Sequence, residues 1–111
     1  MGLDDVMRAL SDPTRREVVR LLARSGPMSA GDLAERFDLA KSTMSGHFNT
    51  LRQAGLIVSE RQGASIVYSA SLSVVEEAMA SILNGFGIGE RRAARDKSEA
   101  ERRQSSDGRA R

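Results

Sequence analysis

The residues best suited to bind a ligand lie in one segment, residues 41–54. At about 100° per residue, a helix here gathers Met44, Phe48 and Leu51 on one side. Uncharged small or polar residues fall on and beside the opposite side: Ser42, Gly46, Asn49 and Gln53, flanked by Thr43, Ser45 and Thr50. Such side chains hydrogen-bond to base edges and phosphates, and a glycine lets a helix approach a duplex closely. The pattern predicts a DNA-reading helix, and the alternative is a polar surface helix without function.

The sequence just before this helix predicts another helix and a short turn. Ser29 followed by Asp32 resembles a capping box, and the helix that it opens runs about two turns to Phe37. Residues 38–40 then form a tight connection. Ala40 leaves the reading helix without a side-chain cap, an omission worth on the order of 1 kcal/mol.

The sequence after the reading helix predicts a β-hairpin. Gly55 closes the helix as a left-handed cap, and two β-rich runs, residues 56–61 and 65–69, follow with a glycine turn between them. At the tip, Arg61 and Gln62 are placed to reach a DNA groove or backbone, unless the tip is only a solvated turn. A helix-turn-helix with such a two-stranded wing can set its second helix into the major groove.

Two helices precede this unit and one follows it. The first is marked by apolar residues at helical spacing: Leu3, Val6, Met7 and Leu10. Asp12 and Pro13 start the second as N-cap and first helical residue. Ser73 caps a last amphipathic helix that carries Val74, Val75, Ala78, Met79 and Ile82. The expected fold class is mainly α with a small β-hairpin, a winged helix-turn-helix of five helices and a two-stranded wing.

Charge divides the chain into a domain, residues 1–86, and a charged tail, residues 87–111. Residues 88–111 hold eight of the 17 Lys and Arg and five of the 15 Asp and Glu, so their net charge is +3. The net charge of the whole chain is +2, so residues 1–87 carry −1. The tail is expected to be disordered, because from Glu90 on no apolar side chain exceeds alanine. The alternative is a charged helix that forms only with a partner or on DNA. Net charge therefore gives no argument that the folded part binds DNA.

Composition excludes most other chemistry. There is no cysteine and the single histidine is His47, so we expect no metal, no cofactor and no enzyme activity. No arrangement around His47 resembles a catalytic triad. We expect this histidine either to be hydrogen-bonded within the domain or to contact a phosphate. No run approaches the roughly 18 apolar residues of a membrane span, and the N-terminal acids do not fit a signal peptide, so we expect a cytoplasmic protein without membrane insertion.

Several segments together resemble the ArsR family of bacterial winged-helix repressors, in particular its SdpR-like members without a metal site. They are residues 9–16, 45–51, 54–57, 61–63 and 68–69, and the resemblance spans about residues 3–84. It implies a sequence-specific repressor that binds a pseudo-palindromic operator in double-stranded DNA as a homodimer. The alternative function is a winged-helix module for protein contacts without specific DNA binding.

The resemblance also assigns residues. By position, DNA contacts fall on the reading helix and the wing, at Lys41, Ser42, Thr43, Ser45, Gly46, His47, Asn49, Arg61 and Gln62, and Thr50 flanks them. The dimer interface falls on the first and last helices, at Leu3, Val6, Met7, Leu10, Val75, Ala78, Met79 and Ile82. Many members carry at position 46 a side chain that can touch a base, so glycine there lowers specificity or leaves it to DNA shape. Metal sensing is disfavoured, because the third helix has no cysteine and the last has no histidine. No effector is assigned.

Overall fold

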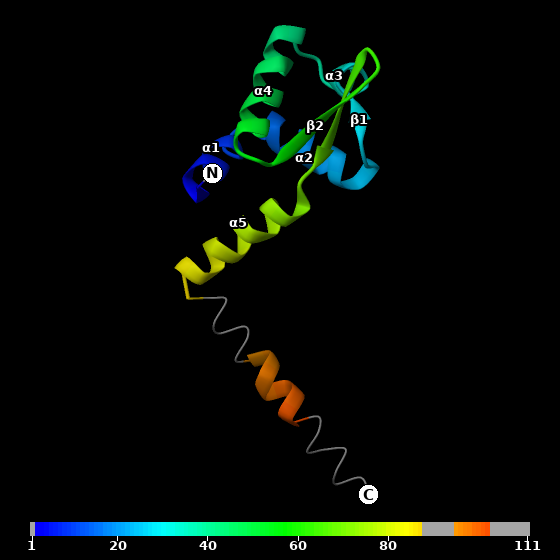
Figure 1. The fold of residues 1–111 in the computed structure, drawn as a ribbon. Coiled ribbons are helices and arrows are strands. Elements are labelled where there is room, and N and C mark those ends of the chain that lie inside the picture. Colours follow the sequence, from blue (N-terminus) through cyan, green and yellow to red (C-terminus); the bar gives the residue numbers. More distant parts are fainter. Residues whose placement is uncertain (1, 88–94, 103–111) are drawn as a thin grey trace, which may run out of the picture. The chain divides into compact units, whose positions relative to one another are not determined.

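The structure is a computed structural model, and it describes residues 2–87 and 95–102. The elements, labelled in Figure 1, are α1 (Leu3–Ala9), α2 (Pro13–Ser25), β1 (Met28–Ser29), α3 (Ala30–Glu35), α4 (Lys41–Gln53), β2 (Ile57–Gln62), β3 (Ser65–Ala70) and α5 (Leu72–Gly85). This order confirms the predicted winged helix-turn-helix. The chain forms two units, residues 1–78 and 79–111, and the helix-turn-helix and wing belong to the first.

The helices begin where the capping residues predict. The Asp12 side chain accepts a hydrogen bond from the Arg15 backbone N–H at 3.1 Å, ahead of Pro13 at the first helical position of α2. The Ser29 hydroxyl oxygen accepts one from the Asp32 N–H at 3.1 Å and starts α3. At α4, Ala40 occupies the N-cap and makes no side-chain hydrogen bond, because its methyl group has no acceptor.

A glycine turn directs the chain from α4 into the wing. Gly55 has φ +76°, and its N–H donates to the Arg52 carbonyl at 3.0 Å, while the Leu56 N–H donates to the Leu51 carbonyl at 3.0 Å. These two bonds form a Schellman motif, which satisfies carbonyls that a helix end leaves free. Leu51 and Leu56, brought together by the motif, are both fully buried.

The sheet has three strands, where the sequence predicted two. The order is β1-β3-β2, all antiparallel; the hairpin pairs Ile57 with Ala70 and Gln62 with Ser65, and β1 pairs Met28 with Tyr68. A two-residue strand has no alternating pattern that a sequence reading can detect. It forms because β3 leaves an unpaired edge to which the chain can add.

Two predicted helix bounds were wrong. Helix α3 ends at Glu35 instead of Phe37, so the connection to α4 runs over residues 36–40 and is longer than predicted. Phe37 nevertheless packs against the core from this connection, which is why it looked like a helix position. Helix α5 starts at Leu72, ahead of Ser73, and the Val75 N–H bonds the Ser71 carbonyl.

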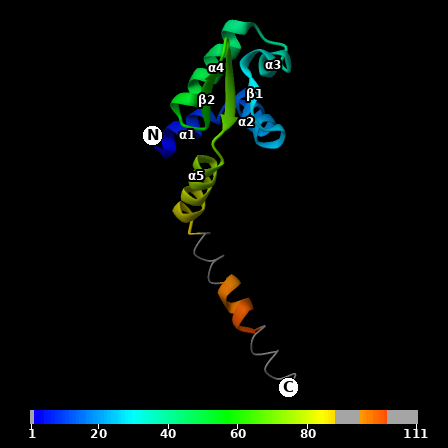
Figure 2. The same ribbon diagram turned by 45° about the vertical axis from the view of Figure 1, so that its right-hand side comes forward.

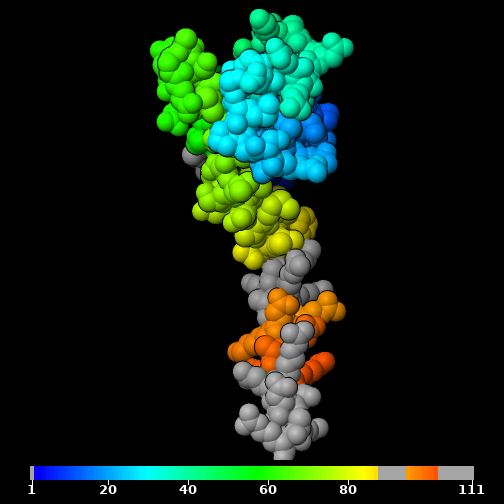
Figure 3. All heavy atoms as spheres, turned by 90° about the vertical axis from the view of Figure 1, so that its right-hand side faces the viewer, coloured from blue at the N-terminus to red at the C-terminus, as the bar shows by residue number. Residues whose placement is uncertain are grey.

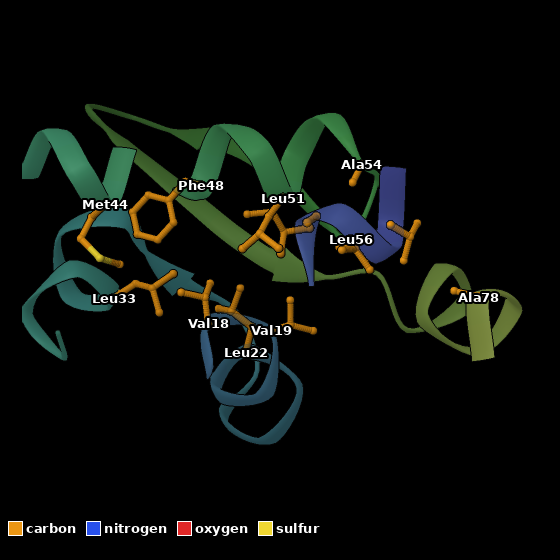
Figure 4. Packing of buried hydrophobic residues seen from close by; sticks show 13 residues of the cluster. Val18, Val19, Leu22, Leu33, Met44, Phe48, Leu51, Ala54, Leu56 and Ala78 are labelled. Carbon is orange, nitrogen blue, oxygen red and sulfur yellow. The ribbon is translucent and has the colours of Figure 1, made fainter. Parts of the chain in front are cut away.

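The core lies between α2, α3, α4 and the start of β2. Figure 4 shows Met44, Phe48 and Leu51 of α4 facing Val18, Leu22 and Leu33. The fully buried side chains are Val18, Leu22, Leu33, Met44, Leu51, Leu56 and Ile57. This packing confirms the predicted inner face of α4.

Two arginines of α2 hold the end of α1. Arg15 Nε donates to the Ala9 carbonyl at 2.6 Å and Nη2 to the Arg8 carbonyl at 3.2 Å. Arg16 Nη1 donates to the Leu10 carbonyl at 2.8 Å. Cations suit the C-terminal end of a helix, where free carbonyls carry partial negative charge. Helix α1 is therefore fixed to α2 through its last carbonyls.

The second unit contains part of the predicted tail. Residues 95–102 are helical and exposed, which differs from the expected disorder at these positions. Ala, Arg, Lys and Glu dominate this stretch and all favour helix, whereas the expected disorder rested on its inability to join a core. The other tail residues, 88–94 and 103–111, lie outside the described residues. None of the described helices is both long enough and apolar enough to cross a bilayer.

We expect Gly55→Ala to lower the free energy of unfolding by about 1 to 2 kcal/mol, because this is the conformational cost of a residue with a Cβ in the left-handed region. Denaturant unfolding followed by circular dichroism measures it. The matched control is Gly46→Ala within α4, where an added Cβ meets no atom within 4 Å. There, alanine should raise stability by roughly 0.5 to 1 kcal/mol. A shift in the same direction for both variants would contradict the role given to Gly55.

We expect the stabilisation by Asp12 to weaken in acid. The Arg15 backbone N–H lowers the pKa of the Asp12 carboxyl below its ordinary 3.8, more than partial burial raises it. The folded state thus favours the carboxylate, so its contribution is complete above the ordinary pKa and is lost as pH falls through the folded-state pKa. Asp12→Asn keeps a capping oxygen but does not ionise. The free energy of unfolding of the wild type, measured relative to that of Asp12→Asn, should therefore fall as pH drops below about 5. A difference between the two proteins that stays constant with pH would refute this.

Candidate nucleic-acid interface

The outer face of α4 presents the predicted reading residues to solvent. With Met44, Phe48 and Leu51 buried, the exposed residues of the helix include Lys41, Ser42, Thr43, Ser45, Gly46, Asn49 and Gln53. Apart from Lys41 at the N-terminus, this face is uncharged and rich in short donors and acceptors. Side chains of this kind can approach base edges without a desolvated charge to compensate.

The wing lies at the same end of the first unit as the start of α4. Figures 1 and 2 agree in placing the N-terminal end of α4 and the tip of the β2–β3 hairpin together. Figure 3 shows the hairpin standing out from the body of the unit. Arg61 and Gln62 are exposed beside the turn, where Gly63 has φ +61°. Helix and wing are therefore exposed at the same end of the unit.

Asn49 is held in place by a residue that was not predicted from the sequence to belong to the site. Arg52 Nη2 donates to the Asn49 side-chain oxygen at 2.8 Å. This bond directs the amide and leaves its NH₂ group able to donate to a base or phosphate. Asn49 and Arg52 are spaced i, i+3 on one helix, and this spacing is the signal that would have suggested the pair.

Thr50 and Gly46 differ from the other predicted contacts. The Thr50 hydroxyl donates to the Gly46 carbonyl at 3.0 Å and the residue is half-buried, so its proton is used within the helix. Gly46 is exposed, and its surroundings would accept a Cβ. Packing within the described residues therefore does not require a glycine at this position.

His47 is half-buried and lies beside α2. Its Nδ1 is 3.4 Å from Nη1 of Arg15. Of the two alternatives for this histidine, the internal contact is present through Nδ1. No partner for Nε2 is found within residues 2–87 and 95–102. Arg15 is a second residue that the sequence reading missed, because the contact joins positions far apart in the chain.

The Lys and Arg side chains of this surface form no ion pair with another described residue. The one ion pair found in the described part of the chain joins Arg20 to Glu17 on α2, at 3.4 Å. Lys41, Arg52 and Arg61 are therefore exposed with no carboxylate of residues 2–87 or 95–102 within salt-bridge distance, and phosphate contacts need such free cations.

A hollow that the sequence did not predict lies between α3, the first half of α4 and β3. It has a volume of about 460 Å³. Its lining is mostly apolar and includes Ala34, Leu39, Met44, Phe48, Ile66 and Tyr68, together with Lys41 and Ser45 of the reading face. Its position links the reading helix to the wing strand. No group of three or more metal-ligating side chains occurs among the residues described.

The comparisons with known proteins agree with this geometry. The helix-turn-helix domain family matches residues 10–60. The transcriptional repressor SdpR of Bacillus subtilis (strain 168) is 40% identical over 88 residues, 79% of this chain and 97% of SdpR.

Two solved structures are similar over most of their length. One is an ArsR family transcriptional regulator with 30% identity and a TM-score of 0.71, covering 79% of this chain and 96% of the other. The second is an ArsR-like transcriptional regulator from Rhodococcus sp. RHA1 with 34% identity and a TM-score of 0.68, covering 88% and 92%. These relatives are regulators and not enzymes, as expected here. The chain belongs to the ArsR family of winged helix-turn-helix transcriptional regulators, which bind DNA.

Proposed function

We propose that the protein is a sequence-specific repressor that binds a pseudo-palindromic operator as a homodimer. The observation that carries this proposal is the exposed, uncharged polar face of α4 at the same end of the domain as the wing tip. Two such surfaces in a dimer would read two half-sites about one helical turn apart. Because its target is DNA, we place the protein in the cytoplasm.

The residues of the surface divide into two roles. Ser42, Ser45, Gly46 and Asn49 lie where α4 would face base edges, and they carry the sequence preference. Lys41, Thr43, His47, Arg61 and Gln62 contact phosphates or the adjacent groove, which sets affinity and register. Thr50, whose proton is engaged within the helix, contributes an acceptor only.

The dimer contacts are proposed on α1 and α5. Helix α5 is rich in apolar residues, yet Ala78 is its single buried residue. Met7 of α1 and Met79 of α5 are 50% and 52% exposed. Other predicted interface residues, such as Val6, are already buried within the chain and would support the interface from beneath. A second copy of the chain would cover the exposed apolar side chains, in an isologous contact.

A module for protein contacts is the alternative function. It is favoured by the net charge of residues 1–87, which is −1; the total becomes positive only through the +3 of residues 88–111. Salt dependence separates the two functions, because each neutralised phosphate releases counterions and binding then weakens steeply with salt.

We expect Asn49→Ala and Arg61→Ala to weaken binding in different ways. The probe is a duplex selected from a random-sequence library by the wild-type protein. Asn49→Ala should lose about 1 to 3 kcal/mol on this duplex and relax its preference at one position of each half-site, because a base contact is lost. Arg61→Ala should weaken binding to all sequences alike and reduce the salt slope by about 1, because a phosphate contact is lost.

Fluorescence anisotropy with the selected duplex, its single-base variants and random DNA, over a range of salt, measures both effects. Arg24→Ala, in the exposed last turn of α2 and outside the reading helix and the wing, is the control and should change neither preference nor salt slope. Identical profiles for Asn49→Ala and Arg61→Ala would contradict the two roles. Salt-insensitive binding would instead support the module for protein contacts.

We expect Met79→Glu to convert the dimer into a monomer and to weaken operator binding with it, because a buried charge without a partner opposes association. Sedimentation velocity gives the oligomeric state. The matched control is Val58→Glu on β2, which changes an apolar residue of similar exposure, 54%, outside the proposed interface. The proposed interface is wrong if Met79→Glu remains dimeric at the concentrations where the wild type is a dimer.

A further inference from the structure

One side chain joins three helices beneath the proposed DNA surface. Arg15 extends from α2, and its Nε and Nη2 donate to the Ala9 and Arg8 carbonyls at the end of α1. Its remaining terminal nitrogen, Nη1, lies 3.4 Å from Nδ1 of His47 on α4. Neither the predicted DNA contacts nor the predicted dimer contacts include this arginine.

The chemistry of the two groups determines which nitrogen of His47 carries the proton. A guanidinium has five N–H donors and no acceptor, so Nδ1 can contact it favourably only as an unprotonated acceptor. A neutral imidazole with a free Nδ1 carries its proton on Nε2. The doubly protonated ring would instead place two cations 3.4 Å apart.

The start of α2 belongs to the same junction. The Asp12 carboxylate interacts electrostatically with His47, and the Asp12 side chain accepts a hydrogen bond from the Arg15 backbone N–H. The direct contact of the Arg15 guanidinium with Nδ1 selects the tautomer of His47.

We propose that Arg15 is a positioning residue for DNA binding, which contacts Nδ1 of His47 on α4 so that the Nε2–H donates to a DNA phosphate. This inference rests on the proposed function, since it requires α4 to lie against DNA. The two bonds from Arg15 to α1 fix the guanidinium, and the fixed guanidinium in turn orients the ring. His47 thereby satisfies both alternatives derived from the sequence, with one nitrogen bound inside the domain and the other directed to phosphate.

Arg16 provides a matched control within the same junction. It also ties α1 to α2, through Nη1 and the Leu10 carbonyl at 2.8 Å, but it has no contact with His47 in the structure. Arg15→Met and Arg16→Met thus each remove one cation and weaken the hold on α1. The loss of the contact with His47 belongs to Arg15→Met alone.

A double-mutant cycle tests the proposal. Affinity for the library-selected duplex is measured for wild type, Arg15→Met, His47→Ala and the double variant, with thermal unfolding to identify the folded fraction. We expect Arg15→Met and His47→Ala each to weaken binding about tenfold, the loss expected for a hydrogen bond to a charged group. In the His47→Ala background, Arg15→Met should cost less than about twofold if it acts through His47. Arg16→Met should stay within about twofold of wild type.

An equal cost of Arg15→Met in both backgrounds would overturn the proposal, because the arginine would then act only through α1 or by its own contact with DNA. An equal loss for Arg16→Met would overturn it as well. If the library yields no preferred duplex, the proposed function itself is wrong. A preferred duplex without coupling in the cycle leaves that function intact and refutes only the role of Arg15.

Nitrogen-15 NMR of the His47 ring gives a readout that needs no DNA. At neutral pH, the free wild-type protein should show the proton on Nε2 and none on Nδ1. Arg15→Met should add the tautomer with the proton on Nδ1, and Arg16→Met should leave the spectrum unchanged. A proton on Nδ1 in the wild type would overturn the proposal. A merely structural role for Arg15 would not move this signature.

Discussion

The burial of one face of α4 is the constraint on which the rest of the structure depends. Met44, Phe48 and Leu51 occupy the core against α2 and α3, and each is at most 4% exposed. Because a helix is rigid at this length, fixing one face fixes the opposite one, and the short polar side chains must point to solvent. The proposed reading surface is thus a direct consequence of the packing of the opposite face.

The junctions around α4 turn this surface into an interface. At its C-terminal end, the glycine turn at Gly55 and the buried pair Leu51 and Leu56 set the direction in which the wing leaves. At its side, Arg15 connects α4 to the end of α1. The reading helix is therefore held from the wing and from the N-terminal helix. On the proposed function, a change in the position of α1 would reach α4 through this arginine.

Charge acts locally in this protein. Residues 1–87 carry −1 in total, so affinity for a polyanion cannot come from the overall field of the domain. On the proposed function it depends on Lys41, Arg52 and Arg61, which lie on the reading helix and the wing and have no carboxylate of the described residues within salt-bridge distance. A modest set of phosphate contacts combined with an uncharged reading face favours discrimination between sequences over tight non-specific binding.

The sequence by itself determined the helices, the wing and the inner face of α4, because caps such as Asp12 and Ser29, the glycine after α4 and the helical apolar spacing are local signals. It also predicted that the outer face of α4 reads DNA, and the structure shows that this face is exposed. Only the tertiary structure decided the third strand at Met28–Ser29, the early end of α3 and the partner of His47. Each of these depends on groups that meet across long stretches of chain: a free strand edge, a core that accepts Phe37 from a loop, and a guanidinium 32 positions away from the ring that it contacts. Periodicity and capping carry no information about such meetings, since they describe only neighbours along the chain.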